Sequence, residues 1–468
     1  FNTAFVPMFS RRLEAEGRED ARAFAEDALA ALALFLLGFT LLAQLAMPWM
    51  VLALASGFAG DERLALATAM GRVAFPYILF ISLAALFSGV LNALGRFAAA
   101  AAAPVLLNLI LIGALGLAAL GLPAEATLGD VPQAEGLRAG AWLVWGVALA
   151  GVAQMALVWR AAARAGLPLR LRRPRWTPAL GRLAMVAAPA ALASGVMQIN
   201  LVVGRQVASF FDGAVAWLYY ADRLYQLPLG VIGVAVGVVL LPELARRLAA
   251  EDAQGAKDAV SRSAEFSLAL ALPASVALMV IPGPIVSVLF ARGAFGPEDA
   301  QATALAAAVY GAGLPAFMLT KVIQPLFFAR ENTKTPFRMA VWGMAANAAI
   351  AVGLSPVLGF AACALATSLS SALVLGLLWR EALRRFGDEA RLDPRLRARL
   401  PRMAAASLAM GVVCLAAQAL LGGLLAAPGW RYLALALLVG AGLVSYAAAA
   451  ALSGAVRPAD LRAALRRG

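Results

Sequence analysis

Residues 214–245 read AVAWLYYADRLYQLPLGVIGVAVGVVLLPELA, a run of 32 residues in which apolar side chains dominate. As a straight helix this run would be about 48 Å long, which exceeds the roughly 30 Å of hydrocarbon in a bilayer. The helix must therefore tilt, bend at Pro228 or project from the membrane. Asp222 and Gln226 lie one turn apart on a single face of this helix, with Arg223 beside them.

The composition of the whole chain agrees with a membrane protein. Of 468 residues, 63% are hydrophobic and only 14% are charged, and the mean hydropathy is +0.83. A soluble domain carries about 25% charged residues, so a water-exposed globule is excluded. Histidine is absent, which excludes histidine bases, histidine-ligated metals and Ser-His-Asp triads. Cys363 and Cys414 lie in apolar runs and are interpreted as small apolar residues.

Apolar stretches predict twelve transmembrane helices in an all-α polytopic protein. No long polar domain separates them. They lie near 28–55, 73–94, 100–120, 139–159, 183–211, 214–245, 264–291, 302–329, 338–352, 361–379, 403–426 and 432–452.

Basic residues predict the orientation of these helices. Of the 39 lysines and arginines, 31 lie in odd-numbered connecting segments and five in even-numbered ones, counted from the N-terminus. The positive-inside rule then places both ends of the chain in the cytoplasm. The heaviest basic segments are 160–182 and 380–402, whereas 121–138 is predicted to be periplasmic. The net charge of +13 is explained by these loops, so no nucleic-acid partner is expected.

Two halves of the chain resemble each other. Residues 7–16, PMFSRRLEAE, match residues 242–251, PELARRLAAE, at an offset of 235. Pro76 matches Pro315 at an offset of 239. Because the offset corresponds to an even number of spans, the halves are expected to be parallel repeats.

The repeat also predicts the organisation of the chain. The helices 183–211 and 214–245 project back to positions before residue 1, so about 55 residues and two helices of a fourteen-helix architecture are expected to be absent. The predicted parts are an incomplete N-terminal lobe (1–160), a basic cytoplasmic linker (161–182), a C-terminal lobe (183–385), a basic cytoplasmic loop (386–402), and two extra helices with a tail (403–468).

The segment 217–235, WLYYADRLYQLPLGVIGVA, resembles the most characteristic segment of the bacterial lipid II flippase family MurJ (MviN), and 1–7, FNTAFVP, is similar to the end of that family's second helix. The resemblance implies the multidrug/oligosaccharidyl-lipid/polysaccharide exporter fold. In this fold two pseudo-symmetric six-helix lobes enclose a central cavity. Two C-terminal helices form a groove for the lipid tail, for which Leu435 and Leu437 are candidates.

The resemblance further implies a transporter and not an enzyme. Lipid II, the lipid-linked peptidoglycan precursor, would be moved from the cytoplasmic to the periplasmic leaflet of the inner membrane by alternating access. Lipid II and membrane lipids are the expected partners of a monomeric protein whose C-terminus is cytoplasmic. No catalytic residue, metal site or cofactor is expected.

Polar residues inside the spans are candidates for the cavity, since each intramembrane charge costs about 2.5–3.5 kcal/mol on insertion scales. The candidates are Arg223, Asp222, Arg205, Lys321, Gln198 and Gln226. The planar fork of Arg223 suits a pyrophosphate, and Asp222 is expected to hold Arg223 while the cavity is empty. Three structural alternatives stay open: a neutralised Asp222–Arg223 pair, Arg205 reaching toward the membrane surface, and Lys321 bonded to a backbone carbonyl at a helix break.

The ion that drives transport is less well defined by the sequence. Some relatives bind sodium with acidic side chains, and Asn347 and Thr367 match polar positions of that site as its remnants. The acidic positions correspond to Gly204 and Ala351. Sodium usually requires a carboxylate among hard oxygen ligands. Sodium coupling is therefore disfavoured, and the membrane potential is the alternative driving force.

Other functions remain as alternatives. An exporter of drugs or of another lipid-linked oligosaccharide would share the fold, although exporters of cationic drugs favour acidic cavities. A membrane glycosyltransferase would need an acidic outer site and large outer loops, and the outer loops here are short. A non-transporting protein is a third alternative, because of the missing helices.

Overall fold

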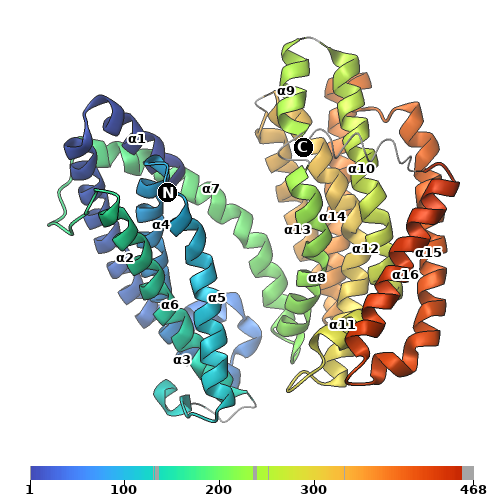
Figure 1. Ribbon diagram of the computed structural model, residues 1–468, viewed down its shortest axis with the longest axis horizontal. Helices are drawn as coiled ribbons and strands as arrows, with labels where there is room; N and C mark the ends of the chain where they lie inside the picture. The colour runs from blue at the N-terminus through green and yellow to red at the C-terminus, as the bar shows by residue number, and fades with distance from the viewer. Residues whose placement is uncertain are drawn as a thin grey trace. The chain divides into compact units, whose positions relative to one another are not determined.

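The computed structural model describes residues 2–129, 131, 136–235, 240–250, 252–330 and 332–455, and all regular secondary structure in these ranges is helical (Figure 1). Side chains are described in these ranges except at 2–4, 188–201, 231–235, 241–242 and 249. The α-helices are α1 (Asn2–Ala15), α2 (Arg18–Leu54), α3 (Glu62–Ala74), α4 (Tyr77–Ala93), α5 (Ala98–Ala119), α6 (Leu137–Arg164), α7 (Pro178–Ala208), α8 (Ala214–Ala235), α9 (Leu241–Ala249), α10 (Ala253–Val280), α11 (Pro282–Phe290), α12 (Pro297–Phe328), α13 (Lys334–Leu358), α14 (Ala361–Phe386), α15 (Pro394–Ala426) and α16 (Arg431–Leu452). Short 3-10 helices are η1 (Ser56–Phe58), η2 (Glu125–Leu128) and η4 (Gly387–Ala390).

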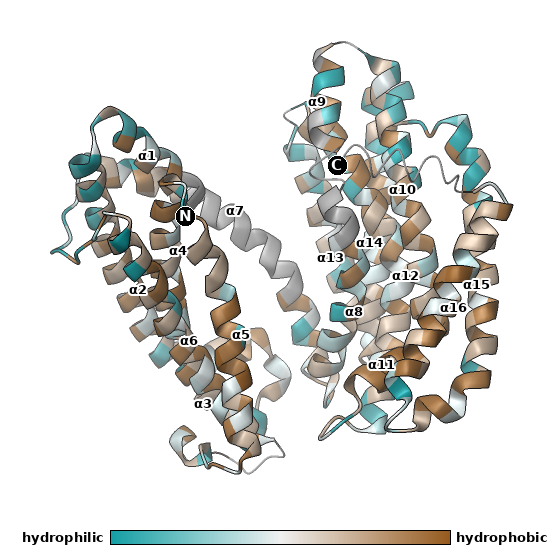
Figure 2. Cartoon of the chain, in the orientation of Figure 1, coloured by the Kyte–Doolittle hydropathy of each residue, from teal (hydrophilic) through white to brown (hydrophobic). Residues whose placement is uncertain are grey.

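Among the described residues, ten helical segments are long and apolar enough to cross a membrane. They match ten of the predicted spans, with α3 and α4 counted together. Helices α7 and α8 lie where the other two spans were predicted. Apolar residues dominate the middle of the helices and polar residues gather near their ends (Figure 2), as expected for a polytopic membrane protein.

The chain divides into two compact units. Unit 1 comprises Phe1–Val202 and unit 2 comprises Val203–Gly468. The division falls inside α7, so the last two turns of this helix belong to unit 2. Each unit has its own apolar core, with Phe5, Phe9 and Leu86 fully buried in unit 1 and Leu314 and Phe327 fully buried in unit 2.

The internal repeat predicted from the sequence is present in the structure. Helix α2 begins at Arg18 and α10 at Ala253, 235 positions later. Helix α5 ends at Ala119 and α13 at Leu358, 239 positions later. In unit 1, α4 packs against α1, α2 and α6, while α5 packs against α6; in unit 2, α12 packs against α9, α10 and α14, while α13 packs against α14. The same pairings recur in the same chain order, so the two units repeat one helix arrangement.

Several helices continue beyond the spans that hydropathy predicts. Helix α3 occupies most of the segment 56–72, which lies between the predicted spans 28–55 and 73–94. Oδ1 of Asp61 caps this helix by accepting a hydrogen bond from the backbone N–H of Arg63 at 2.9 Å. Much of 380–402 is also helical, because α14 extends to Phe386 and α15 begins at Pro394. Hydropathy detects the residues that contact lipid, whereas a helix ends where its backbone groups are capped.

A buried carboxylate ties the segment after α6 to α2. The side chain of Glu26 is fully buried. Its Oε1 accepts hydrogen bonds from Nε of Arg22 at 2.9 Å and from the backbone N–H of Arg170 at 3.0 Å, and its Oε2 forms an ion pair with Nε of Arg172 at 2.5 Å. Because an unpaired buried carboxylate is costly, these partners are required together. The predicted linker 161–182 is therefore anchored within unit 1.

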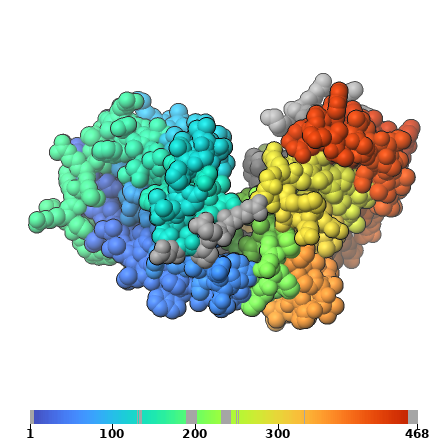
Figure 3. Space-filling model, turned by 90° about the horizontal axis from the view of Figure 1, so that it is seen from below, coloured from blue at the N-terminus to red at the C-terminus, as the bar shows by residue number. Residues whose placement is uncertain are grey.

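The C-terminal helices are fastened to α10 by a group of charges, the α10–α15 clasp, formed by Glu265, Arg395 and Arg399. Glu265 pairs with Nε of Arg395 at 3.2 Å and also with Arg399, whose side chain is only 7% exposed. On α16, the hydroxyl of Tyr446 donates to the carbonyl of Ala269 at 2.7 Å. The pair α15 and α16 (red) thus lies along one side of unit 2 (Figure 3) and has no counterpart in the repeat.

Leu435 does not lie on the outer face of α16, so its predicted position in a lipid-tail groove is wrong. It packs in an apolar cluster with Leu438, Met410 and Cys414, which joins α15 and α16 to α11. Leu437, in contrast, is 52% exposed. Cys414 and Cys363 are both buried and free, which confirms their interpretation as small apolar residues.

Candidate functional site

Aromatic and polar contacts fix the rotation of α8 within unit 2. Nε1 of Trp217 donates to Oδ1 of Asp299, in the first turn of α12, at 2.6 Å. The ring of Tyr220 lies 4.9 Å from that of Phe290 and 5.2 Å from that of Phe295, measured between centroids. These contacts hold one side of α8 against unit 2 and determine which of its residues stay on the surface.

Arg223 lies on the exposed face of α8 and rests on Tyr219, one turn earlier. The guanidinium carbon is 4.6 Å from the centroid of the Tyr219 ring, and Nη2 donates to the Tyr219 hydroxyl at 3.0 Å. Both side chains are exposed. The contact with Tyr219 orients the guanidinium. An arginine has five N–H donors, and among the described residues only one of them is seen to donate a hydrogen bond, to Tyr219.

The expected ion pair between Asp222 and Arg223 is not formed. Neighbouring residues of a helix point about 100° apart, so their side chains leave α8 in different directions. Asp222 is half-buried and instead accepts a hydrogen bond from Nε2 of Gln226, one turn later. Arg205, exposed in the last turn of α7, lies within electrostatic reach of the Asp222 carboxylate. The Arg223 charge also acts on the Asp222 carboxylate, but no direct ion pair joins the two side chains.

Lys321 is connected to α8 through aromatic rings. Its Nζ lies 5.3 Å from the centroid of the Phe317 ring, one turn earlier on α12. The Phe317 ring makes an edge contact with Tyr225 of α8 at 6.1 Å. Lys321 is exposed on a continuous stretch of α12, so the alternative of a lysine bonded to a carbonyl at a helix break does not apply.

The predicted remnants of an ion site are brought together between α13 and α14. Nδ2 of Asn347 lies 3.4 Å from Oγ1 of Thr367 and 3.4 Å from Oγ of Ser370. The buried Tyr310 of α12 also lies close to Thr367. Ala351, one turn after Asn347, is fully buried. The oxygen atoms gathered here are therefore neutral, unlike the carboxylates that a hard cation prefers.

Tyr310 and Tyr225 were not identified from the sequence, yet they join the two predicted sites. Their ring centroids are 5.6 Å apart. Tyr225 lies on α8 three residues after Asp222, and Tyr310 reaches Thr367 on α14. The only sequence signal is the position of Tyr225 on the Asp222 helix. Gln198 belongs to α7, but its side chain lies outside the described residues.

Comparison with known proteins gives consistent results. Residues 1–439 match the family described as lipid II flippase MurJ. A probable lipid II flippase MurJ of Rhizobium meliloti (strain 1021) is 41% identical over 478 residues, covering 100% of this chain and 86% of the relative. A protein of the same description from Rhizobium tropici is 45% identical over 372 residues, covering 79% of this chain and 68% of the relative.

Solved structures show the same fold. A lipid II flippase MurJ in an inward closed conformation superposes with a TM-score of 0.74 at 21% identity, covering 96% of this chain and 87% of that one. A multidrug resistance transporter of the MATE family in an inward-facing conformation has a TM-score of 0.64 at 16% identity, covering 83% of this chain and 86% of that one. The expected relation to multidrug exporters is confirmed at the level of fold.

Proposed function

The chain belongs to the lipid II flippase MurJ family, and from this premise we propose how unit 2 binds the substrate. The protein is a polytopic transporter of the bacterial inner membrane and not an enzyme. It flips lipid II, which serves peptidoglycan synthesis. Lipid II and the surrounding membrane lipids are its partners.

We propose that Arg223 binds the pyrophosphate of lipid II. The observation that carries this proposal is the exposed guanidinium, which is supported by the Tyr219 ring and forms no direct ion pair with Asp222. A planar guanidinium donates two parallel charged hydrogen bonds to a phosphate. Asp222 and Gln226 form the adjoining polar turn of α8. Arg205, Lys321 and Gln198 are proposed to complete the binding surface.

The lobes, the linker and the C-terminal helices have separate roles in transport. Residues 1–160 and 183–385 act as the two lobes of an alternating-access cycle in a monomer, joined by the linker 161–182. The helices within 403–468 hold the lipid tail on their outer face, where Leu437 is exposed. No nucleic acid takes part, because the basic residues serve membrane topology and substrate binding.

Transport is expected to depend on the membrane potential and to be insensitive to sodium. The Asn347–Thr367 site offers neutral oxygens, whereas Arg223, Arg205 and Lys321 are cationic. Each charge that moves across the field is worth about 2.3 kcal/mol per 100 mV. We expect vesicles containing the purified chain to flip labelled lipid II. Replacing sodium with potassium should change the rate by less than about twofold, and dissipating the potential should slow it several-fold.

Protein-free vesicles, and vesicles offered a lipid-linked oligosaccharide without the peptide, are the controls for this experiment. Equal transport of both lipids would favour a general exporter of the same fold. Loss of transport on removing sodium would contradict the expectation that the neutral oxygens of the Asn347–Thr367 site do not bind sodium.

Cysteine labelling tests the proposed orientation, with both ends in the cytoplasm. Arg173 and Ala126 are both exposed. Cysteine at position 173 is expected to react only after the membrane is made permeable, and cysteine at position 126 is expected to react in intact spheroplasts. Cys363 and Cys414 are buried and are replaced by alanine in the control background. Labelling of both positions from the same side would overturn the topology.

A further inference from the structure

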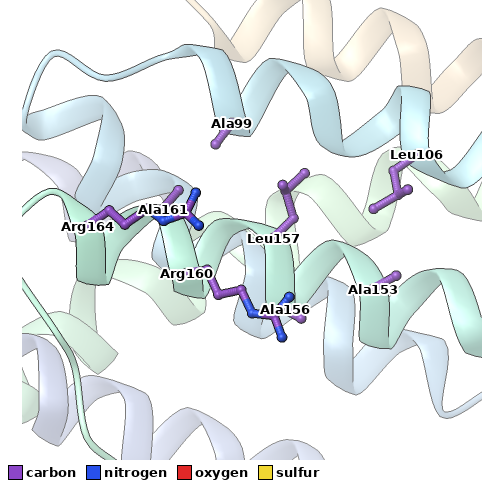
Figure 4. Close-up of a pocket in the computed structure, with 8 residues that line it drawn as sticks. All are labelled: Ala99, Leu106, Ala153, Ala156, Leu157, Arg160, Ala161 and Arg164. Atoms are coloured by element: carbon purple, nitrogen blue, oxygen red, sulfur yellow. The ribbon is translucent and has the colours of Figure 1, made fainter.

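A groove lies between α5 and α6 on the surface of unit 1. Its volume is about 530 Å³, within the range of roughly 300–1,000 Å³ typical of small-molecule sites. Figure 4 shows small apolar side chains along its walls and two arginines toward one end. The lining residues are Ala99, Leu106, Ala153, Ala156, Leu157, Ala161, Arg160 and Arg164.

The groove has a rigid base. Nε2 of the buried Gln154 donates to the carbonyl of Ala103 at 2.7 Å and fastens α6 to α5. Nearer the other end of the pair, a Cβ on Gly146 would lie only 3.1 Å from that of Ala114, so the helices are in close contact there. Because the two helices are held together at these points, the space between Ala99 and Leu157 stays open where the side chains are short. The groove is therefore preformed.

The chemistry of the groove changes along its length. From Ala153 to Leu157 the lining residues of α6 are apolar, over a distance of about 6 Å along the helix. Arg160 and Arg164 follow at a spacing of one turn, both exposed. Neither forms an ion pair with any acidic side chain among the described residues. In Figure 4, the Arg160 side chain reaches back along α6 toward Ala156, so that its charge lies beside the apolar wall.

Neighbouring residues place this charged end at a membrane surface. Arg96 precedes α5 and lies, with Arg160 and Arg164, in segments predicted to be cytoplasmic. Trp159 is 48% exposed and Phe97 is 62% exposed. Exposed aromatic side chains beside basic residues are typical of the boundary between lipid tails and headgroups. The apolar part of the groove is then at the depth of the acyl chains.

We propose that this groove binds an anionic glycerophospholipid of the cytoplasmic leaflet. The phosphate group is bound by Arg160 and Arg164, and one acyl chain lies between α5 and α6 against Leu106 and Leu157. The charge complementarity selects an anionic headgroup, and the apolar walls require a lipid, since a soluble anion would leave them unfilled. None of the residues that line the groove is among those assigned to substrate binding.

The test is native mass spectrometry of the purified protein. It measures how tightly the protein retains phosphatidylglycerol and how tightly it retains phosphatidylcholine. The double variant R160Q/R164Q is expected to weaken phosphatidylglycerol binding roughly fivefold for each arginine, or about 25-fold in total. The matched control R173Q/R175Q removes the same charge from exposed positions of the linker and should bind as the unaltered chain does. Equal binding by both variants, or equal loss in both, would overturn the proposal.

A second variant separates a groove from a general surface charge. A153L/A156L keeps both arginines and fills the apolar wall with larger side chains, so it should also lose the tightly bound phosphatidylglycerol. Unchanged phosphatidylglycerol binding by this variant would show that the lipid is bound by surface charge alone, and would refute binding in the groove. Displacement of phosphatidylglycerol by equimolar lipid II would likewise refute it, since the groove would then be a substrate site. An unchanged unfolding temperature shows that each variant is folded.

Discussion

Replacing Arg223 with alanine is expected to abolish the ability of the protein to support growth of a strain depleted of its own flippase. Two charged hydrogen bonds to the pyrophosphate together contribute about 3 kcal/mol or more, so lipid II transport in vesicles should fall roughly 100-fold. The variant should still insert and fold, because Arg223 is exposed and contacts mainly Tyr219. Membrane abundance and transport rate are the two measurements.

Conservative variants separate charge from geometry at this position. Arg223→Lys should fail largely, because an ammonium group lacks the planar fork. Tyr219→Phe keeps the ring that lies 4.6 Å from the guanidinium and removes only the hydroxyl, so a loss of less than tenfold is expected. Asp222→Asn should be mild, because Asp222 does not hold Arg223. Normal growth of the Arg223→Ala strain at native expression would refute substrate contact and leave a packing role.

Glu265→Ala is expected to be the most destabilising single change in unit 2. It would leave Arg399, whose side chain is 7% exposed, without its carboxylate partner. Removing one member of a buried ion pair costs about 3–5 kcal/mol. The unfolding temperature of the purified protein should drop by roughly 5–10 °C. Lipid-tail binding should weaken as well, because α15 is fastened to α10 through this residue.

An exposed ion pair in the same unit is the control. Asp388 pairs with Arg391 at 2.9 Å, but their side chains are 74% and 61% exposed. Such pairs contribute about 0–1 kcal/mol, so Asp388→Ala should hardly change the unfolding temperature. Glu265→Gln should lie between the two, since the amide oxygen can still accept a hydrogen bond from Arg399. Equal unfolding temperatures for Glu265→Ala and Asp388→Ala would show that the clasp does not stabilise the protein.

Hydropathy and the internal repeat were enough to predict most of the fold. The spans follow from a physical requirement of the bilayer, and the offset between the repeated motifs recurs between α2 and α10. The ends of the helices could not be predicted in the same way. In α3 and in the N-terminal part of α15, charged residues continue the helix into water, and hydropathy does not distinguish such a stretch from a loop.

The candidate site was predicted in its residue types but not in its contacts. Arg223 and Tyr219 are four residues apart, so their contact follows from helix geometry, whereas Asp222, which is adjacent in sequence, forms no direct ion pair with Arg223. The contact of Tyr310 with Thr367 joins residues of α12 and α14. It depends on how these helices pack, which no local pattern encodes. Leu435 was misplaced for the same reason, because both faces of α16 are rich in leucine and alanine.

The buried position of Glu26 has a consequence for the order of events during synthesis. Arg22 is made before Glu26, but the backbone N–H of Arg170 comes 144 residues later. At about 5–20 residues per second, the ribosome needs roughly 7–30 s to supply that partner. During this delay the carboxylate depends on water and Arg22, so the start of α2 must wait near the membrane surface. Unit 1 can close only when the linker after α6 has left the ribosome.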